Sequence, residues 1–141
     1  MRKRALTEYE LGFIEAMIDG EGTICLARNF CKTHIAIFRP EVSIFNTNLA
    51  ILNKIKKFTG RGNIIIFKSE LYTHGVSYTL RFSPNDIRWL LPQLKLVIKE
   101  HKRKIMLRVL KVLTLRKQYC RWRKEYKLKE LNMLYKLFYK K

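Results

Sequence analysis

The run from Leu11 to Gly22, Leu-Gly-Phe-Ile-Glu-Ala-Met-Ile-Asp-Gly-Glu-Gly, is an apolar stretch that ends on two carboxylates set among glycines. Its apolar residues keep the spacing of one helical stripe, and the alternating residues 23–30 that follow at once predict a strand. We therefore expect a helix that ends near Asp19 and turns directly into a strand.

The charge of the chain makes this acidic turn unusual. Lys and Arg total 30 against 11 Asp and Glu, a formal net charge of +19 in 141 residues. Such an excess indicates a polyanionic partner, for which nucleic acid is the default and a membrane surface the weaker alternative. Fixed carboxylates would repel a phosphate backbone unless a metal ion lies between them, so the turn is a candidate metal site.

Composition favours one folded domain, residues 1–141, because 48% hydrophobic residues are too many for a disordered basic tail. No apolar run approaches the ~20 residues of a membrane-spanning helix, and we expect no secretory signal and no membrane partner. Cys25, Cys31 and Cys120 cannot all pair, which predicts free thiols in an intracellular location, whether cytoplasm, nucleoid or organelle. A zinc site from Cys25, Cys31 and His34 is disfavoured because it lacks a paired Cys-x-x-Cys.

The element order has no regular βαβ alternation and predicts an α+β fold with an antiparallel sheet. The second extended segment, 34–45, should bend at Arg39-Pro40. Thr7 with Glu10 forms a capping box that opens the first helix. The later expected elements are a helix opened by Asn46-Thr-Asn48 and closed by Thr59-Gly60, strands 62–69 and 75–82, a short helix from Ser83, a long basic helix 93–117, and a last helix 121–141 with the apolar stripe Leu128, Leu131, Leu134, Tyr135 and Phe138.

One face of the first helix carries almost no side chain, because Gly12, Ala16 and Gly20 recur every four residues. Such a face lets two helix backbones approach closely, a steric argument best attested in membranes. Two contacts remain open for this face, one with a second copy of the chain and one with the chain's own sheet.

Residues 14–22, Ile-Glu-Ala-Met-Ile-Asp-Gly-Glu-Gly, resemble the LAGLIDADG signature of homing endonucleases, with Asp-Gly-Glu-Gly in place of its Asp-Ala-Asp-Gly end. The match extends over residues 8–105. A strand follows the motif, Asn46-Thr47 opens a helix after the second strand, Gly60-Arg-Gly62 precedes the third, and a Lys-rich helix comes late, all in the family's order. Glu15 is a charged departure from the signature that must point away from a helix pair or find a partner.

The resemblance implies an α-β-β-α-β-β-α core with a four-stranded antiparallel DNA-binding sheet, here followed by extra C-terminal helices. It implies a site-specific, intron-encoded double-strand DNA endonuclease that uses Mg²⁺ or Mn²⁺ on a long pseudo-palindromic site. Because the motif occurs once, we expect a homodimer with Gly12 and Ala16 at the contact. An RNA maturase and a non-catalytic nucleic-acid-binding protein of the same fold remain as alternatives.

The resemblance also assigns roles within the motif. Asp19 would cap the helix end by holding backbone amides of the turn. Glu21 would be the metal ligand, helped by the Gly20 carbonyl, at a helix end whose dipole favours a cation.

Outside the motif, Asn46 matches the family position whose amide positions the attacking water, and it could be a helix N-cap instead or at the same time. The segment 96–102 matches a basic stretch near the scissile phosphate, where a lysine would stabilise transition-state charge. Lys99 and Lys102 would share a helix face and either could serve, with His101 as a rival.

The outward face of the sheet is the expected DNA-binding surface, since a two-stranded ribbon fits the major groove. Arg28, Arg61 and the basic runs 99–104 and 121–124 are expected to hold phosphates, which supply affinity rather than sequence choice. Among the candidate base contacts the small apolar Cys25 and Ala27 indicate contact with thymine methyls. By strand parity and loop position the candidates are Thr23, Cys25, Ala27, Asn29, Lys32, Arg39, Ser43, Lys68, Ser77, Thr79 and Arg81.

Overall fold

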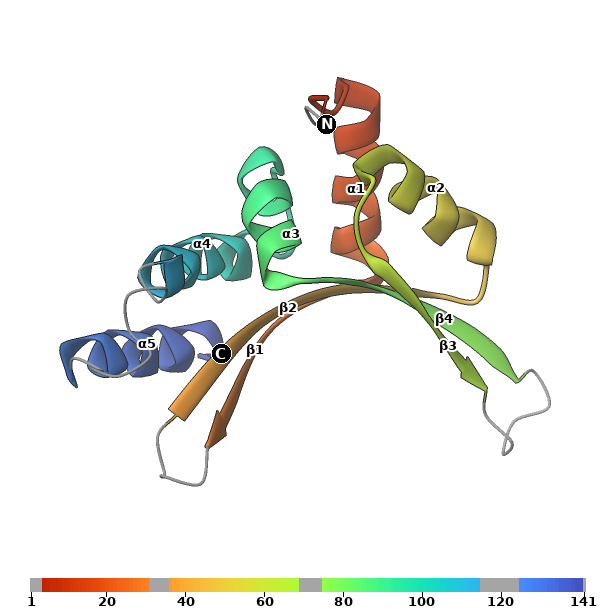
Figure 1. Cartoon of the computed structure of the whole chain (residues 1–141). Helices are drawn as coiled ribbons and strands as arrows, with labels where there is room; N and C mark the ends of the chain where they lie inside the picture. The colour runs from red at the N-terminus through yellow and green to blue at the C-terminus, as the bar shows by residue number, and fades with distance from the viewer. Residues whose placement is uncertain (1–3, 31–35, 69–74, 115–124, 141) are drawn as a thin grey trace.

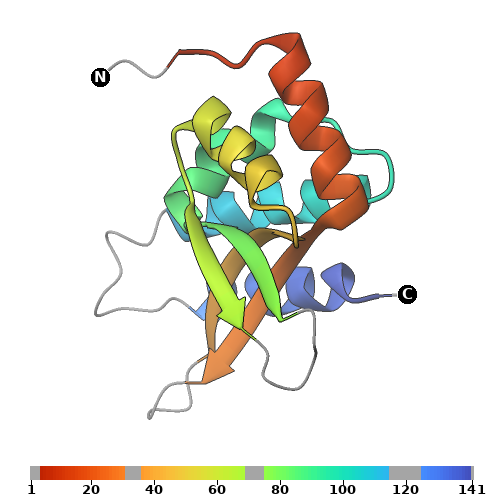
Figure 2. The same cartoon turned by 90° about the vertical axis from the view of Figure 1, so that its right-hand side faces the viewer.

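The computed structural model describes residues 4–30, 36–68, 75–114 and 125–140, and the structural statements that follow concern these ranges. Four strands form one curved sheet with helices on its convex side (Figure 1). Helices α1 and α2 lie side by side over the sheet (Figure 2). The elements are α1 (Glu8–Glu21), β1 (Gly22–Phe30), β2 (Ala36–Asn46), α2 (Leu49–Thr59), β3 (Asn63–Lys68), β4 (Val76–Phe82), α3 (Pro84–Leu90), the 3₁₀ helix η1 (Leu91–Gln93), α4 (Glu100–Thr114) and α5 (Glu125–Phe138).

The sheet has one buried face and one open face. Its strand order is β1-β2-β4-β3 and every neighbouring pair is antiparallel, which confirms the expected α+β fold. Ile14 and Ile18 of α1 are fully buried against the convex side. The strand residues of the same core alternate along the chain and are at most 2% exposed: Ile24, Leu26, Val42, Ile44, Leu80 and Phe82.

Side-chain caps place the helix ends where the sequence predicts them. Thr7 and Glu10 form the expected capping box of α1, and Ser83 opens α3 in the same way with Asp86. Asn48 is the N-cap of α2, since its side chain accepts a hydrogen bond from the amide of Ala50. Gly60, at φ 61°, ends α2 in the left-handed conformation that glycine adopts without strain.

The bend expected at Arg39-Pro40 is wrong, because β2 runs unbroken through both residues. Pro40 pairs with Leu26 in a continuous register, and β4 pairs with β2 only from Val42 onward. Proline lacks an amide hydrogen, and this part of β2 has no second strand to which that hydrogen would be donated. The strand therefore tolerates proline without a bulge.

The long basic helix begins at Glu100 and not at residue 93, so its expected start is wrong. Side-chain carboxylates accept hydrogen bonds from the backbone amides that precede α4. Glu15 accepts from the amide of Lys95, Glu100 from that of Leu96, and Asp19 from that of Val97. Side-chain acceptors of this kind compete with helical hydrogen bonds, so residues 94–99 are not helical.

Helix α5 packs against α4, as expected for its apolar stripe, and it also contacts the edge of the sheet. Leu134 and Phe138 are buried at 0% and 2% exposure. The Tyr139 hydroxyl donates to the Leu26 carbonyl over 3.0 Å and lies 3.3 Å from the Leu26 amide, so it meets the unpaired edge of β1. The Arg28 guanidinium lies 4.2 Å from the centroid of the Tyr135 ring. This guanidinium, which we expected to hold a phosphate, therefore packs against an aromatic side chain of α5.

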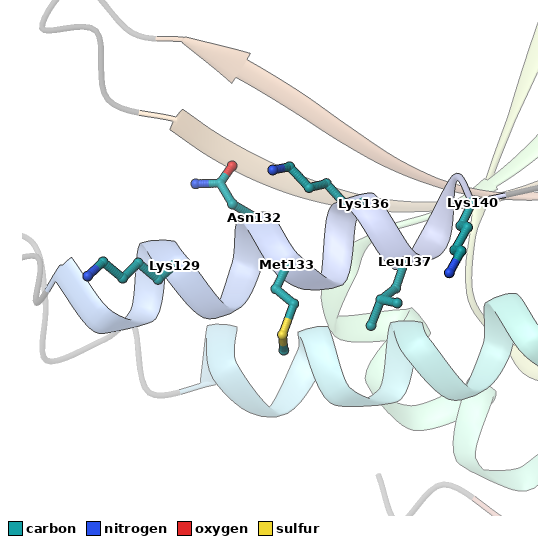
Figure 3. A pocket seen from close by; sticks show the side chains of 6 residues that line it. All are labelled: Lys129, Asn132, Met133, Lys136, Leu137 and Lys140. Carbon is teal, nitrogen blue, oxygen red and sulfur yellow. The ribbon is translucent and has the colours of Figure 1, made fainter.

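A pocket of about 450 Å³ opens along α5. Figure 3 shows Met133 and Leu137 pointing toward α4. The other lining residues are mostly basic: Lys129, Asn132, Lys136 and Lys140. No helix in the described ranges has the length and apolar character needed to cross a membrane.

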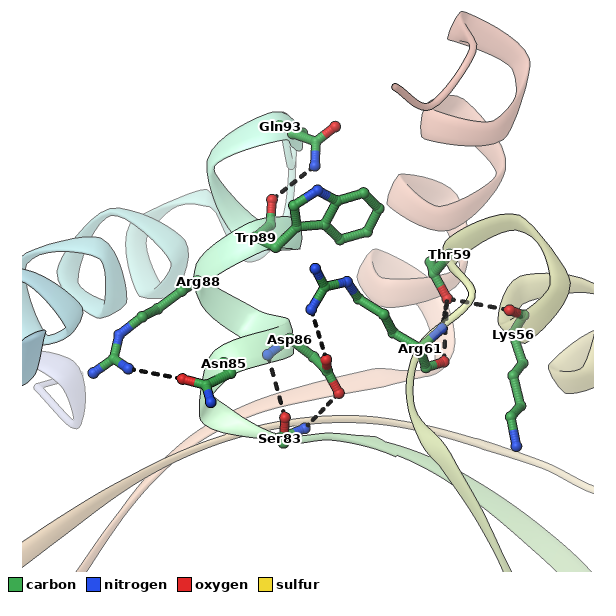
Figure 4. A network of polar contacts seen from close by, with 9 residues as sticks. All are labelled: Lys56, Thr59, Arg61, Ser83, Asn85, Asp86, Arg88, Trp89 and Gln93. Atoms are coloured by element: carbon green, nitrogen blue, oxygen red, sulfur yellow. Dashed lines mark hydrogen bonds and ion pairs between the residues drawn. The ribbon is translucent and has the colours of Figure 1, made fainter. Parts of the chain in front are cut away.

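Arg61 also has a structural role instead of the expected contact with phosphate (Figure 4). Its guanidinium donates to Asp86 over 2.9 Å and lies 4.6 Å from the Trp89 ring centroid, with 12% of the side chain exposed. Burial raises the pKa of Asp86, but hydrogen bonds from Arg61 and Ser83 outweigh it and hold the pKa below its usual value. The ion pair between Arg61 and Asp86 therefore links the start of β3 to α3.

We predict that Asp86→Ala lowers the free energy of unfolding by about 2–3 kcal/mol, because it removes the capping-box acceptor of the Ser83 amide and leaves Arg61 without its carboxylate partner. Folding lowers the pKa of Asp86, so its contribution is present above the unfolded-state pKa of about 3.9 and is lost as pH falls through the folded-state value. Urea unfolding at pH 7 and pH 3 measures this. The difference in the free energy of unfolding between Asp86→Ala and wild type should be smaller at pH 3.

Glu10→Ala is the matched control, since Glu10 closes the other capping box but pairs with the largely exposed Arg4. It should cost about 1 kcal/mol. Equal losses for the two variants would contradict a special role for the contact between Arg61 and Asp86.

Candidate nucleic-acid interface and catalytic turn

The α1–β1 turn is built around Gly22. A Cβ at this position would lie 2.6 Å from the Cα of Ile18, so no larger residue fits without moving the backbone. The Gly22 amide donates to the Ile18 carbonyl and ends α1, and β1 begins at the same residue. The tight turn leaves the preceding Glu21 exposed beside the first residues of the sheet.

The small-residue face of α1 is open. Gly12, Ala16 and Gly20 are all exposed, and a Cβ added to Gly12 or Gly20 meets no atom of the described chain within 4 Å. The alternative in which this face packs on the chain's own sheet is therefore wrong. Tyr9, one of the exposed aromatic residues at 63%, lies on the same helix face two turns before Ala16.

Asp19 holds the segment that leads into α4. Its Oδ2 accepts from the Val97 amide over 2.7 Å and its Oδ1 from the Lys99 amide over 3.0 Å. It holds backbone amides as expected, but they belong to this segment, while the C-cap of α1 is Gly22. Burial raises the pKa of Asp19, yet these amide hydrogen bonds and the charge of Lys99 outweigh it and keep the pKa below its usual value.

Lys99 is the cation at the end of α1. Its Nζ donates to the carbonyl oxygens of Ile18 over 2.7 Å and Asp19 over 2.6 Å, where the negative end of the helix dipole favours a positive charge. The Nζ of Lys102 instead lies 5.3 Å from the Phe138 ring centroid, and His101 Nε2 lies 3.4 Å from a carbonyl of α5. Because α4 begins after Lys99, the expectation that Lys99 and Lys102 share a helix face is wrong.

Glu21 differs from the neighbouring acidic residues because its carboxylate has no hydrogen-bond or ion-pair partner in the described chain. A free carboxylate and the carbonyl of the exposed Gly20 are hard oxygen donors of the kind that Mg²⁺ prefers. The described residues contain no group of three His, Cys, Asp or Glu side chains that could hold a metal ion. The donors therefore fit a Mg²⁺ or Mn²⁺ ion that takes its remaining ligands from phosphate, water or a second chain.

Asn46 is the last residue of β2. Its Oδ1 accepts from the Asn48 amide over 2.8 Å, and Asn48 rather than Asn46 is the N-cap of α2. The alternative in which Asn46 is the N-cap is therefore wrong, and its role toward water stays a prediction.

The concave face of the sheet carries most of the candidate base contacts. Thr23, Cys25, Ala27 and Asn29 alternate with buried residues of β1, and the register places their counterparts on β2 and β4 on the same side: Arg39, Ser43, Ser77, Thr79 and Arg81. Lys68 is an exception, because it pairs with Val76 and shares its face with the buried Leu80. Lys32, the zinc candidates Cys31 and His34, and the basic run 121–124 lie outside the described residues.

Two of these side chains already have partners within the chain. Arg39 Nε lies 3.5 Å from Oε1 of Glu41, with which it forms an ion pair along the same strand. Cys25 Sγ lies 3.3 Å from the Tyr139 hydroxyl, and burial, with this hydrogen bond, raises the pKa of Tyr139 to about 12. Tyr139 therefore remains neutral at physiological pH and can donate to the edge of β1.

The sequence prediction missed three large apolar residues on the concave face, Phe45, Ile65 and Phe67. The last two belong to the run Ile64-Ile-Ile-Phe67, which has no alternation of polar and apolar residues. Strand register, which pairs Ile65 with Thr79, is the signal that places them.

No protein-family model matches this sequence, and no curated protein sequence matches it. The archaeal intron-encoded homing endonuclease I-Vdi141I, complexed with DNA, matches 91% of this chain and 80% of its own, at 19% identity and a TM-score of 0.72. The group I intron-encoded homing endonuclease I-CeuI, complexed with DNA, matches 99% of this chain and 70% of its own, at 11% identity and a TM-score of 0.75.

A longer structure matches through part of its length. The LAGLIDADG meganuclease I-CpaMI, bound to uncleaved DNA, matches 86% of this chain but 43% of its own, at 17% identity and a TM-score of 0.69. At these identities the likeness shows the fold. The chain has the fold of the LAGLIDADG homing endonucleases, an α-β-β-α-β-β-α core followed by further C-terminal helices.

We predict that Asp19→Asn lowers the free energy of unfolding by about 1–2 kcal/mol at pH 7, because an amide cannot accept at both of its ends. Since folding lowers the pKa of Asp19, the loss should shrink as pH falls below about 4. Glu15→Gln is the control, because its one acceptor contact with the Lys95 amide can persist. Denaturant unfolding at both pH values tests this, and an Asp19→Asn protein as stable as wild type would contradict it.

Proposed function

We propose that this chain is one half of a homodimeric, divalent-metal-dependent DNA endonuclease that cuts both strands of a specific, long pseudo-palindromic site. The observation that carries the proposal is Glu21, a carboxylate without a partner among the described residues, held at a tight turn near Lys99 and an open sheet face. In a chain with a net charge of +19, an exposed carboxylate there is accounted for by a metal ion shared with a phosphate.

The residues around the turn would divide the work of hydrolysis. Glu21 and the Gly20 carbonyl would hold Mg²⁺ or Mn²⁺, which when bound activates water and stabilises charge on the phosphoryl oxygens. Lys99 uses two of its three donors on α1 carbonyls, and the third is left for a phosphate oxygen. Asn46 would orient the attacking water through its side-chain amide.

Two observations support the homodimer. The chain contains the motif once, and the face formed by Gly12, Ala16 and Gly20 is uncovered. The match to I-CpaMI, a longer protein, covers 43% of its chain. Two copies packed through α1 would bring both Glu21 residues together, one for each DNA strand.

The concave sheet face would read the bases, and basic surfaces around it would hold phosphates. Arg81 and Asn29 are exposed on this face. The lysines of the α5 pocket lie on or just after α5, near the point where Tyr139 hydrogen-bonds to the β1 edge, and would add phosphate contacts. An intron origin for the gene rests on the sequence resemblance.

We predict that Glu21→Gln lowers the cleavage rate at least about a hundredfold, the loss expected when a group that stabilises transition-state charge is removed. Wild-type and variant protein would be incubated with Mg²⁺ and DNA carrying the intron-less insertion site, and the products resolved on a gel. Glu8→Gln removes the same charge from the exposed start of α1 and should cut normally.

The outcomes separate the alternatives. Undiminished cutting by Glu21→Gln contradicts the assignment of the metal ligand. An intact wild-type protein that binds the site without cutting is a binder, and one that binds the intron RNA instead is a maturase.

We predict that Gly12→Leu, alone or with Ala16→Leu, converts the dimer to a folded monomer that no longer makes double-strand breaks. The open space around Gly12 leaves room for a side chain within one chain but not between two helices in close contact. Sedimentation measures the mass, and thermal unfolding checks the fold. Asn53→Leu, an exposed site on α2, controls for an added surface leucine, and a Gly12→Leu protein that stays dimeric refutes the proposed interface.

A further inference from the structure

Three large apolar side chains form an exposed patch on the concave face of the sheet. Phe45 is 50% exposed, Ile65 42% and Phe67 64%. Thr79 of β4 pairs with both Phe45 and Ile65, so these residues form one row across three strands. Phe67 lies in the next row of the same face, opposite Ser77.

The β1 half of the same face has different chemistry. Opposite the small residues Cys25 and Ala27 of β1 lie Glu41 and Arg39, which form an ion pair. Asn29 is exposed near the end of β1. The concave face therefore has a polar half with hydrogen-bonding groups and an apolar half at the β3 edge.

We infer that the patch of Phe45, Ile65 and Phe67 reads thymine by contact with its C5-methyl group in the major groove. The inference rests on the proposed function and adds to it the kind of base that this half of the sheet selects. The thymine methyl is the apolar group that a natural base pair presents in the major groove. In the polar half, exposed Asn29 offers a side chain that can read bases through hydrogen bonds.

Charge favours DNA over a protein as the occupant of the patch. Arg81 is exposed on the same face, one row from the patch, where it pairs with Asn63. The small hydroxyl residues Ser77 and Thr79 separate the apolar side chains and leave room for a base edge between them. In a chain of net charge +19, an apolar patch beside Arg81 suits a polyanion that carries methyl groups.

Uracil substitution tests the inference directly, because uracil in DNA lacks only the methyl group. The Glu21→Gln protein would first select its preferred site from a randomised duplex pool, without cutting it. Affinity would then be measured for that site and for the same site with uracil in place of thymine. We expect the wild-type dissociation constant to rise about fourfold for each contacted methyl, the value of one buried methylene group.

Variants of β3 provide a matched comparison. Ile65→Ser and Phe67→Ser should each reduce the preference for thymine DNA over uracil DNA. Ile66→Ser alters the same residue type on the same strand, but Ile66 is 58% exposed on the opposite face, where it pairs with Tyr78. It should keep the full wild-type preference for thymine, and circular dichroism would verify that all three variants are folded.

Each result decides the matter. Equal affinity of wild type for both DNAs, or a preference unchanged by Ile65→Ser and Phe67→Ser, overturns this inference and leaves the endonuclease intact. If those variants instead reduce the mass of the protein in sedimentation and keep the preference, the patch is a protein contact and the inference fails. A protein that enriches no DNA sequence contradicts the proposed function as well.

Discussion

The contact between the end of α1 and the segment before α4 determines how the site is built. Asp19 accepts amide hydrogen bonds from Val97 and Lys99, and the Lys99 ammonium returns two hydrogen bonds to carbonyls of the last turn of α1. Asp19 thereby pairs backbone amides of the non-helical residues 97–99, and Lys99 pairs carbonyls at the end of α1 that the helix leaves without intrahelical partners. The result is a cation and a turn held in one place by charge-assisted hydrogen bonds.

The remaining architecture follows from this arrangement. With one stripe of α1 buried and another holding residues 95–99, the glycine face is the part of the helix left uncovered. Gly22 then directs the chain into β1, so the acidic turn and the concave sheet face are adjacent. Helices on the convex side bury one face of the sheet and leave the other free for a ligand.

Local signals in the sequence predicted the elements that depend on local contacts. The capping boxes at Thr7 and Ser83, the Gly60 C-cap and the alternation of β1 were all visible in the residues themselves. The wrong predictions for the start of α4 and for Pro40 concern places where tertiary contacts decide the conformation. Residues 94–99 have a helical pattern, but their backbone amides at Lys95 and Lys99 donate instead to carboxylates about eighty residues away. Pro40 is tolerated because β4 ends before reaching it.

The candidate site shows the same division. The motif identified the turn, but the position of Lys99 depends on where α4 begins, which the sequence pattern did not show. Arg28 and Arg61 are residues of the type that binds phosphate. In the folded chain, however, Arg28 packs on Tyr135 and Arg61 pairs with Asp86. Basic residues in a highly charged chain thus divide into structural and free groups by tertiary contact, which composition alone does not reveal.

Asp19 and Glu21 illustrate this division within two residues. Both are carboxylates at the same helix end, where the dipole disfavours negative charge. Asp19 offsets that cost with amide hydrogen bonds, and its pKa is lowered by them despite burial. Glu21 has no such compensation in the described chain, although the tight turn at Gly22 holds its backbone in place. Within the described chain, Glu21 is therefore a carboxylate held in place without a partner, which distinguishes it from Asp19.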